Sequence, residues 1–479
     1  MGGMLRFSRR TIVMLSMLAA EVIVSGQKAP SAADHPWDAS SAKQQLPSPR
    51  LLAPVAIDPA KIYTLAELVN IAEQNNPETR VAWENAKARA ADLGIAKSTL
   101  YPTLAAVALA TSVQLGVFFG NSFQKQTTES ISPGGLTVDY TIFDFGQRSE
   151  QISASKSKLL ASNFQFNDTH RKVIFQVMQA YYKLLDTKGK EDAAKANLKD
   201  AQTVQQAAEA RLQSGLTTLP DVLETRSAAA QADYDLQAAI GATEIAYGDL
   251  AFSLGIPPTT QFQVESLEDI KLPDAIAGGV EASIDKALSQ RPDLVQRVAE
   301  LRAASADVSV AHKAYFPTLT IGGSVGVNRS YGVQINLPPV YSPTTTTWVG
   351  TLTLHWTLFD GLARENRLAK ARADQRQAAA SVESIRIQIE NEVWSAYSTA
   401  RTALRQQRAA AALLKAATES YNSSVESYHY GLRNEINVVT AQRTLADARA
   451  TDVNARTQLL TALATLAYQT GDLLYAKIP

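Results

Sequence analysis

A long internal repeat restricts the fold of this chain more than any other feature of its sequence. The phrase YTIFDFGQR at residues 140–148 returns as WTLFDGLAR at residues 356–364. Upstream of this phrase the two copies align at an offset of 215, so that Pro77 matches Pro292. Across the phrase the offset becomes 216 and stays there to the end. One insertion in about two hundred aligned positions indicates a duplicated structural unit, which chance similarity of Ala-rich helices does not explain.

Each copy contains a very long helix-forming stretch. Residues 147–214 hold no proline and one glycine, residues 362–430 hold neither, and both are rich in Ala, Gln, Glu, Lys, Arg and Leu. Each predicts one helix about 100 Å long at 1.5 Å per residue. Two shorter helices per copy add up to nearly this length, which predicts that they run antiparallel beside it. They are expected at about 78–100 and 219–254 in the first copy, and at about 293–314 and 435–470 in the second.

Two strands are predicted before each long helix. The segments LTVDYTIF and LTLHWTLF alternate apolar and polar residues, as a strand with one apolar face does. Each is preceded by a less regular strand candidate, and the one that begins at Leu104 is expected to carry a β-bulge. Loops rich in Ser, Thr, Gly, Asn and Pro are expected around 118–135 and 329–347.

The repeated phrase marks the junction at which a strand ends and the long helix begins. Phenylalanine closes the strand, the aspartate side chain caps the helix, and glycine permits the turn. Gly215 and Gly431 follow the long helices, where a glycine often caps a helix C-terminus. These two glycines therefore mark the turns at the helix tips. The junction residues are Phe143, Asp144 and Gly146 in the first copy and Phe359, Asp360 and Gly361 in the second.

Composition excludes several functional classes. Lys and Arg number 46, as do Asp and Glu, so no strongly basic surface for nucleic acid is expected. The chain has no cysteine, which excludes disulfides, thiol catalysis and cysteine-ligated metals. The five histidines show no spacing typical of a metal site, and no nucleotide-binding motif is present, so neither metal nor cofactor is expected.

The N-terminus resembles a secretory signal peptide. Arg6, Arg9 and Arg10 precede a short apolar run that ends at Ser25-Gly26. An uncleaved N-terminal anchor is the alternative. The predicted organisation is a signal peptide at 1–26, an extended lead-in at 27–60, repeat 1 at 61–255, a linker at 256–280, repeat 2 at 281–471 and a tail at 472–479. The expected strands lie at about 103–118 and 135–144 with a helical tip near 215, and at about 318–329 and 348–359 with a tip near 431.

Four strands with free edges do not form a stable structure in a membrane. Their unpaired N–H and C=O groups cannot face hydrocarbon, so closure of a barrel needs further copies of the chain. A dimer would supply eight strands and a trimer twelve, and a hollow helical wall favours the larger ring. The predicted fold is mixed α+β and predominantly α. The chain is then the tandem-repeat protomer of a ring, and a trimer would give this ring twelve strands.

With these features the chain resembles the TolC-like outer-membrane efflux proteins. The resemblance rests on the tandem halves, the Phe-Asp junctions, and the tips LQSGLTTLPDVLETR and YHYGLRNEINVVTAQRTL, and it covers residues 61–475. It implies a homotrimer in outer-membrane lipid of a Gram-negative bacterium, with a large periplasmic portion. The implied assembly is a trimeric 12-stranded outer-membrane β-barrel continued by a long periplasmic α-helical barrel. It also implies an exit duct for small molecules or polypeptides that docks to a periplasmic adaptor and an inner-membrane pump. Many relatives carry a lipid on an N-terminal cysteine, which this chain lacks.

The resemblance also implies a gate at the helical tips. Acidic residues that line the aperture in the family match Asn437 and Thr440 here, which are neutral. Their counterparts in the first repeat are Asp221 and Glu224, which would supply six carboxylates in a trimer. The alternative is that these two acids only favour a helix N-terminus and remain solvated. The positions that latch neighbouring helices in relatives match Tyr428 and Arg433.

Two other functional classes compete with an export duct. A soluble periplasmic coiled-coil scaffold or adaptor would explain the Ala-rich helices, but it leaves the alternating strands unexplained. A secreted hydrolase is suggested by Gly322-Gly323-Ser324-Val325-Gly326, which matches the GxSxG nucleophile motif. That motif requires a helix after the serine, whereas strand-like residues follow it here. The sequence therefore favours a channel without enzymatic activity.

Overall fold

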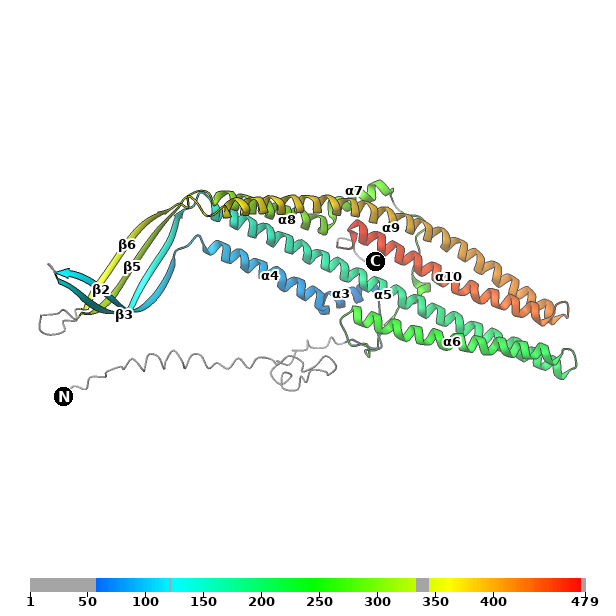
Figure 1. The fold of residues 1–479 in the computed structure, drawn as a ribbon. Coiled ribbons are helices and arrows are strands. Elements are labelled where there is room, and N and C mark those ends of the chain that lie inside the picture. The colour runs from blue at the N-terminus through cyan, green and yellow to red at the C-terminus, as the bar shows by residue number, and fades with distance from the viewer. Residues whose placement is uncertain (1–56, 120–121, 277, 333–343, 475–479) are drawn as a thin grey trace, which may run out of the picture. The chain divides into compact units, whose positions relative to one another are not determined.

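The computed structural model describes residues 57–119, 122–276, 278–332 and 344–474 of the 479-residue chain. The predicted signal peptide lies outside these residues, as do residues 27–56 of the lead-in and the last five residues of the tail. The described part consists of one four-stranded sheet, long helices that continue from it, and a small group of short elements packed beside the helices (Figure 1).

The sheet joins the two repeats. Its strands follow the order β2-β3-β5-β6, and all neighbours are antiparallel. The central pair, β3 and β5, comes from different repeats, so neither repeat forms a closed sheet of its own. The strands span Thr103–Phe119 (β2), Ser122–Phe143 (β3), Thr318–Gly332 (β5) and Thr344–His355 (β6).

Two predicted strand boundaries are wrong. The loop expected around 118–135 is largely strand, because β2 and β3 stay paired as far as Phe119 and Ser122. The last strand was expected at 348–359, but β6 ends at His355, so Trp356 and Phe359 lie beyond it. His355 pairs with Thr318, the first residue of β5, and Pro317 before it has no N–H to extend the ladder. The bulge expected in β2 is confirmed by a register shift between Val107 and Leu109.

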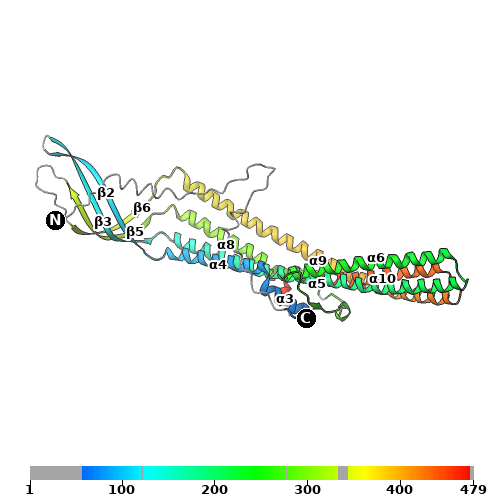
Figure 2. The same cartoon turned by 90° about the horizontal axis from the view of Figure 1, so that it is seen from below.

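The two long helices are confirmed as single helices of 67 residues each, α5 (Gln147–Gln213) and α9 (Ala363–His429). Shorter helices run beside them, as the lengths predicted (Figure 1, Figure 2). In each repeat one of these follows the tip and the other leads into a strand. In addition, α5 packs against two helices of the second repeat, α8 and α10. The shorter helices are α4 (Pro77–Ser98), α6 (Leu219–Ser253), α8 (Pro292–Lys313) and α10 (Glu435–Thr470).

Short elements form a compact pad, here called the waist, around the middle of the long helices. Its core packs Leu68 of the first short helix against Val177 and Leu184 of α5 and Leu250 of α6, all at most 1% exposed. The predicted linker contributes a strand and a 3-10 helix to this pad. The waist elements are β1 (Ile62–Tyr63), α3 (Leu65–Asn75), β4 (Gln263–Val264), η1 (Leu267–Asp269), α7 (Val280–Gln290) and η2 (Asp472–Leu474).

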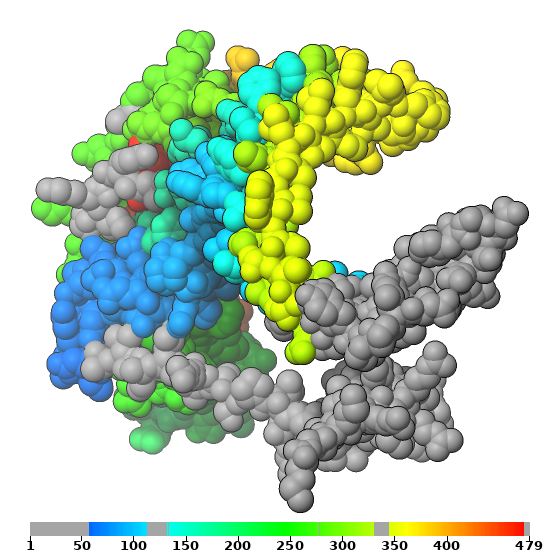
Figure 3. Space-filling model, turned by 90° about the vertical axis from the view of Figure 1, so that its left-hand side faces the viewer, coloured from blue at the N-terminus to red at the C-terminus, as the bar shows by residue number. Residues whose placement is uncertain are grey.

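Below the waist, the second hairpin is packed mainly through alanine. Ala400, Ala403, Ala410 and Ala417 of α9 are buried, mostly against α10, and small side chains allow helices to approach closely. Seen from the sheet end, the strands and helices form an arc around a hollow (Figure 3). None of the helices in the described residues has a segment long and apolar enough to cross a membrane.

Candidate functional site

Each strand-to-helix junction is organised by one aspartate. The Asp144 carboxylate accepts hydrogen bonds from the backbone N–H groups of Gly146 and Arg148, both at 3.0 Å, and from Arg148 Nε at 2.7 Å. Asp360 accepts from the backbone N–H and the Nε of Arg364, both at 3.1 Å. N–H groups in the first turn of a helix have no partner within the helix, and the carboxylates supply one. Burial opposes ionisation of Asp144, but the bonds from Arg148 outweigh it and lower the pKa of this carboxyl.

The junction turns contain two consecutive residues with positive φ. In the first repeat these are Phe145 (φ 53°) and Gly146 (φ 80°); in the second they are Gly361 (φ 69°) and Leu362 (φ 68°). The glycine thus occupies the second position in one copy and the first in the other. Each copy keeps one side-chain-bearing residue in a conformation that favours glycine.

The helical tips close with the glycine turns that the sequence predicts. Gly215 (φ 71°) follows α5 and Gly431 (φ 73°) follows α9. The next backbone N–H, of Leu216 or Leu432, returns to the carbonyl oxygen five residues earlier at 2.8 Å in both tips. This hydrogen bond is typical of a helix that ends at a left-handed glycine. The two hairpins therefore end in the same backbone geometry.

A cluster of polar side chains ties the two tips together. The ring of Tyr428, which is 6% exposed, lies under the guanidinium of Arg211 at 4.4 Å, and Arg211 Nη1 donates to the Tyr428 carbonyl oxygen at 2.8 Å. The Tyr428 hydroxyl donates to Glu435 Oε1 at 2.7 Å, and Thr217 Oγ1 donates to the same oxygen at 2.8 Å. Burial and the neighbouring Glu435 raise the pKa of Tyr428 to about 12, so its hydroxyl stays protonated and donates. We call these four residues the tip cluster.

The remaining gate candidates lie around the tip cluster. Asp221 Oδ2 accepts from the backbone N–H of Thr218 (3.0 Å) and from the hydroxyls of Thr218 (2.6 Å) and Thr217 (3.0 Å). These bonds make Asp221 part of the N-terminal cap of α6, and the hydroxyls of Thr218 and Thr217 lower its pKa. Glu224, one turn further along α6, is half-buried.

On the second hairpin, Arg433 Nη1 donates to Ser424 Oγ at 3.2 Å. Asn434 caps α10, and the backbone N–H of Asn437 donates to its Oδ1 at 3.3 Å, so Asn437 is capped where Asp221 is itself part of the cap. The Thr440 hydroxyl donates to the carbonyl oxygen of Ile436 at 2.7 Å. The structure thus brings Tyr428 into contact with the first hairpin, whereas the described contacts of Arg433, Asn437 and Thr440 stay within the second.

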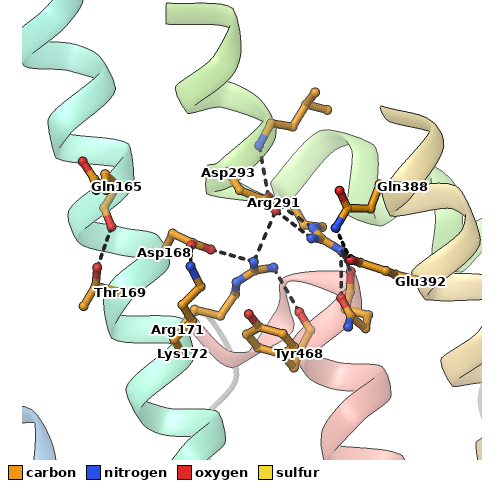
Figure 4. Close-up of polar contacts among 12 residues, drawn as sticks. Gln165, Asp168, Thr169, Arg171, Lys172, Arg291, Asp293, Gln388, Glu392 and Tyr468 are labelled. Carbon is orange, nitrogen blue, oxygen red and sulfur yellow. Dashed lines mark hydrogen bonds and ion pairs between the residues drawn. The ribbon is translucent and has the colours of Figure 1, made fainter. Parts of the chain in front are cut away.

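A second polar cluster lies at the waist, where α5 meets the second repeat (Figure 4). Arg171 is 1% exposed. It donates to Asp168 Oδ1 at 2.6 Å and to the Tyr468 carbonyl oxygen at 3.1 Å, and it lies 3.5 Å from Asp293 Oδ2. Arg291, 3% exposed, donates to Asp293 at 2.6 and 3.1 Å and to Glu392 at 2.7 Å.

The charges of this waist cluster balance, because Lys172 adds a third cation through its 2.7 Å contact with Asp168. Three carboxylates and three cations therefore lie together at the join of the repeats. Burial raises the pKa of Asp293, but Arg291 and then Arg171 outweigh burial and lower it. The arrangement joins α5, α8, α9 and α10 through charge-balanced hydrogen bonds, and of the two buried guanidinium groups only that of Arg171 keeps one nitrogen, Nε, without a partner among the described residues.

Sequence reasoning missed the residues that join the repeats at both clusters. Arg211 aligns with Ser427, Glu435 with Leu219, and Arg291 with Asn76. At each of these positions only one copy of the repeat carries a charge. A search of the aligned copies for such differences would have found them, whereas the search for shared landmarks passed over them.

The other candidate chemistries find no supporting geometry. Ser324 lies in the middle of β5 and pairs with Thr137 of β3 and Val349 of β6, so no helix follows it. Within the described residues, no group of three or more His, Cys, Asp or Glu side chains is arranged to hold a metal ion.

Comparison with known families and curated proteins identifies relatives along nearly the whole chain. The model of the outer membrane efflux protein family matches residues 68–256 and 283–472, the two repeats. The chain is 26% identical over 443 residues to protein CyaE of Bordetella pertussis, which covers 90% of this chain and 88% of that protein. It is 28% identical over 422 residues to the pyoverdine export outer membrane protein OpmQ of Pseudomonas putida, with 84% of each covered.

Solved structures share the fold. The outer-membrane channel OprN matches with a TM-score of 0.74 at 21% identity, over 93% of this chain and 98% of that one. CusC, described as forming a transmembrane channel, matches with a TM-score of 0.70 at 19% identity, over 85% of this chain and 92% of that one. The arrangement of one sheet and long helical hairpins is therefore shared with outer-membrane channels.

Proposed function

Because the chain belongs to the outer membrane efflux protein family, and so is an outer-membrane efflux channel, we propose that three copies close into one duct. The sheet lies in the outer membrane and the helices extend into the periplasm. The observation that carries this proposal is the sheet order β2-β3-β5-β6, which leaves β2 and β6 with one unpaired edge each. Such edges cannot face lipid, and three copies pair all of them in a ring of twelve strands.

The helices support the same ring. Within one chain α5 packs against α6, α10 and α8, whereas α6 and α9 lie at opposite ends of this row. Large apolar side chains are exposed on both outer helices and on α4. Packing copies side by side would cover them, which favours assembly. They include Val81 and Ile95 of α4, Tyr234, Ile245 and Phe252 of α6, and Ile387, Trp394 and Leu413 of α9, which are 46–82% exposed.

The partners we propose are a periplasmic adaptor and an inner-membrane pump, which dock at or near the helical tips. Relatives differ in what they export, since one is named for pyoverdine export and another, CusC of Escherichia coli, for cation efflux. Cargoes with so little shared chemistry favour a duct that leaves the choice of cargo to the pump. We also propose that residues 1–26 direct secretion and that no lipid is attached through cysteine, since the sequence has none.

The tip cluster is the proposed latch of the gate. Arg211 donates to Tyr428 and Thr217 donates to Glu435, so the two hairpins cannot separate without breaking these contacts. Asp221 and Glu224 are the proposed charged groups at the aperture. The cap that Asp221 forms supports its structural role in α6, and its side chain is only half-buried, which is compatible with a second role at the aperture.

Assembly and conductance test the proposal together. Full-length protein extracted in detergent should have the mass of three copies by light scattering and should conduct ions in planar lipid bilayers. A stable monomer that needs no detergent would support the coiled-coil scaffold instead. Trimers that never conduct under conditions that open the tips would contradict the duct.

A further inference from the structure

The two outer helices of the lower hairpins carry opposite charge. Helix α6 has six acidic residues and one arginine. On α9, the segment 394–418 has four basic residues and no acidic one. Helix α10, which is covered on both sides by α5 and α9, has three of each sign. The excess charge is therefore confined to α6 and α9, the two helices at the ends of the row (Figure 1).

The contact between α5 and α10 inside the chain shows how such helices meet. Asp200 of α5 pairs with Arg449 of α10 at 2.7 Å, and Arg449 also donates to Asn197 at 2.7 Å. Eleven residues correspond to about three helical turns, so positions eleven apart on each helix lie on nearly the same face. This salt bridge therefore fixes which residues of the two antiparallel helices lie opposite each other.

Because the two repeats are equivalent, the α5–α10 contact within the chain predicts the geometry of the contact between copies. Helix α9 is the second copy of α5, and α6 is the first copy of α10, at an offset of 216. Asp200 therefore corresponds to Ala416, and Arg449 corresponds to Asp233. Lys415 lies next to Ala416. Arg405 is eleven residues before Ala416 on α9, and Glu244 is eleven residues after Asp233 on α6. Because the two helices are antiparallel, Arg405 and Glu244 lie opposite each other.

We propose that α9 of one copy packs on α6 of the next copy in the register of α5 on α10, with the charges reversed. Lys415 then pairs with Asp233, and Arg405 pairs with Glu244. All four side chains are exposed in the single chain, as such a role requires. The inference rests on the proposed trimer and assigns the residues that orient its helical wall.

These pairs set the direction of assembly more than its strength. An exposed ion pair contributes little to stability. Two α6 helices, or two α9 helices along their basic segments 394–418, would however repel each other, so contacts that place like edges together are disfavoured. The remaining contact, α9 on α6, is head-to-tail, and a head-to-tail contact with the correct rotation closes into a ring.

Crosslinking tests the register, because the chain has no native cysteine. The variant Ala416→Cys with Asp233→Cys should give covalent dimers and trimers with a bismaleimide about as long as the 8–10 Å between packed helices. The control, Ala416→Cys with Glu244→Cys, moves one thiol about 16 Å along α6 and should give little product. Trimers by light scattering without this preference would overturn the register and leave the proposed duct intact. Absence of trimers in the unmodified protein would overturn the duct itself.

Charge exchange tests the pairing without new thiols. Lys415→Glu and Asp233→Lys should each weaken the trimer about fivefold per interface, measured by dissociation on dilution in detergent. The double exchange should return affinity to within about twofold of the unmodified protein, because attraction is restored with reversed polarity. If the double variant is as weak as the two single effects combined, Lys415 and Asp233 do not meet.

Discussion

At the scale of single residues, the two repeats differ at the junction turns and at the two polar clusters that join them. The junction glycine occupies different positions in the two copies, and most charged residues of the tip and waist clusters occur in one copy only, whereas Asp293 matches Glu78. The sequence predicted Tyr428, because it matches a known landmark. It did not predict Arg211 or Glu435, because each is charged in one copy only and the prediction followed features that the two copies share.

The left-handed leucine of the second junction provides a stability prediction. Leu362→Gly should stabilise the protein by about 1 kcal/mol, because glycine adopts a φ of 68° without the Cβ clash. The side chain is 57% exposed, so little packing is lost. Thermal unfolding in detergent measures the effect. Gly361→Ala, at the preceding left-handed position, should shift the melting temperature in the opposite direction.

The tip cluster predicts a change in gating. Tyr428→Phe removes the hydroxyl that holds the Glu435 carboxylate in place for Thr217 of the first hairpin, and should weaken the closed tip by about 1 kcal/mol, or about fivefold in the ratio of closed to open channels. Single-channel recordings in planar bilayers report this ratio. Tyr430→Phe is the control, because Tyr430 is 71% exposed and outside the cluster. Equal open fractions in the two variants would contradict the latch.

The acids of α6 predict ion selectivity. Asp221→Asn with Glu224→Gln should reduce the preference for cations at neutral pH, because carboxylates around a narrow mouth attract cations. Asn437→Asp should increase it. Reversal potentials under a salt gradient measure both changes. A double neutral variant with unchanged selectivity would leave Asp221 with its capping role alone.

At the scale of elements, helices were easier to predict than strands. Absence of proline over 67 residues of α9 and favourable composition determine a helix locally. Strand ends depend on the neighbouring strand, and this explains both boundary errors. β3 extends back to Ser122 because β2 remains beside it, and β6 stops at His355 because β5 begins at Thr318.

Proline substitution tests the continuity of α9. Ala400 is fully buried against α10, and Ala400→Pro should cost about 3 kcal/mol or more and reduce trimer yield, because it removes a backbone donor inside the helix. Ile436→Pro is the control. It places proline in the first turn of α10, where the first repeat already has Pro220, and should be tolerated. Circular dichroism and light scattering would show whether the two variants differ.

At the scale of the whole molecule, the waist cluster predicts acid sensitivity. The pKa of Asp293 is lowered in the folded protein, so its contribution is present above its unfolded pKa of about 4 and is lost as pH falls through the lower folded value. Asp293→Asn should cost about 3 kcal/mol at neutral pH, since Arg171 and Arg291 lose a buried partner, and should flatten the acid dependence of the melting temperature. Asp307→Asn, whose pair with Lys158 is 39–48% exposed, should change little.

The equal length of α5 and α9, 67 residues each, has a consequence for how such a protein changes over time. The four-helix cross-section below the waist requires every helix to have a neighbour at every height. A heptad removed from α9 alone would leave about 10 Å of the helices beside it uncovered. We therefore expect an insertion or deletion in one of these helices to be tolerated only when the other three helices change in length by the same amount. The matched lengths of α5 and α9 therefore fix the distance between the sheet and the helical tips.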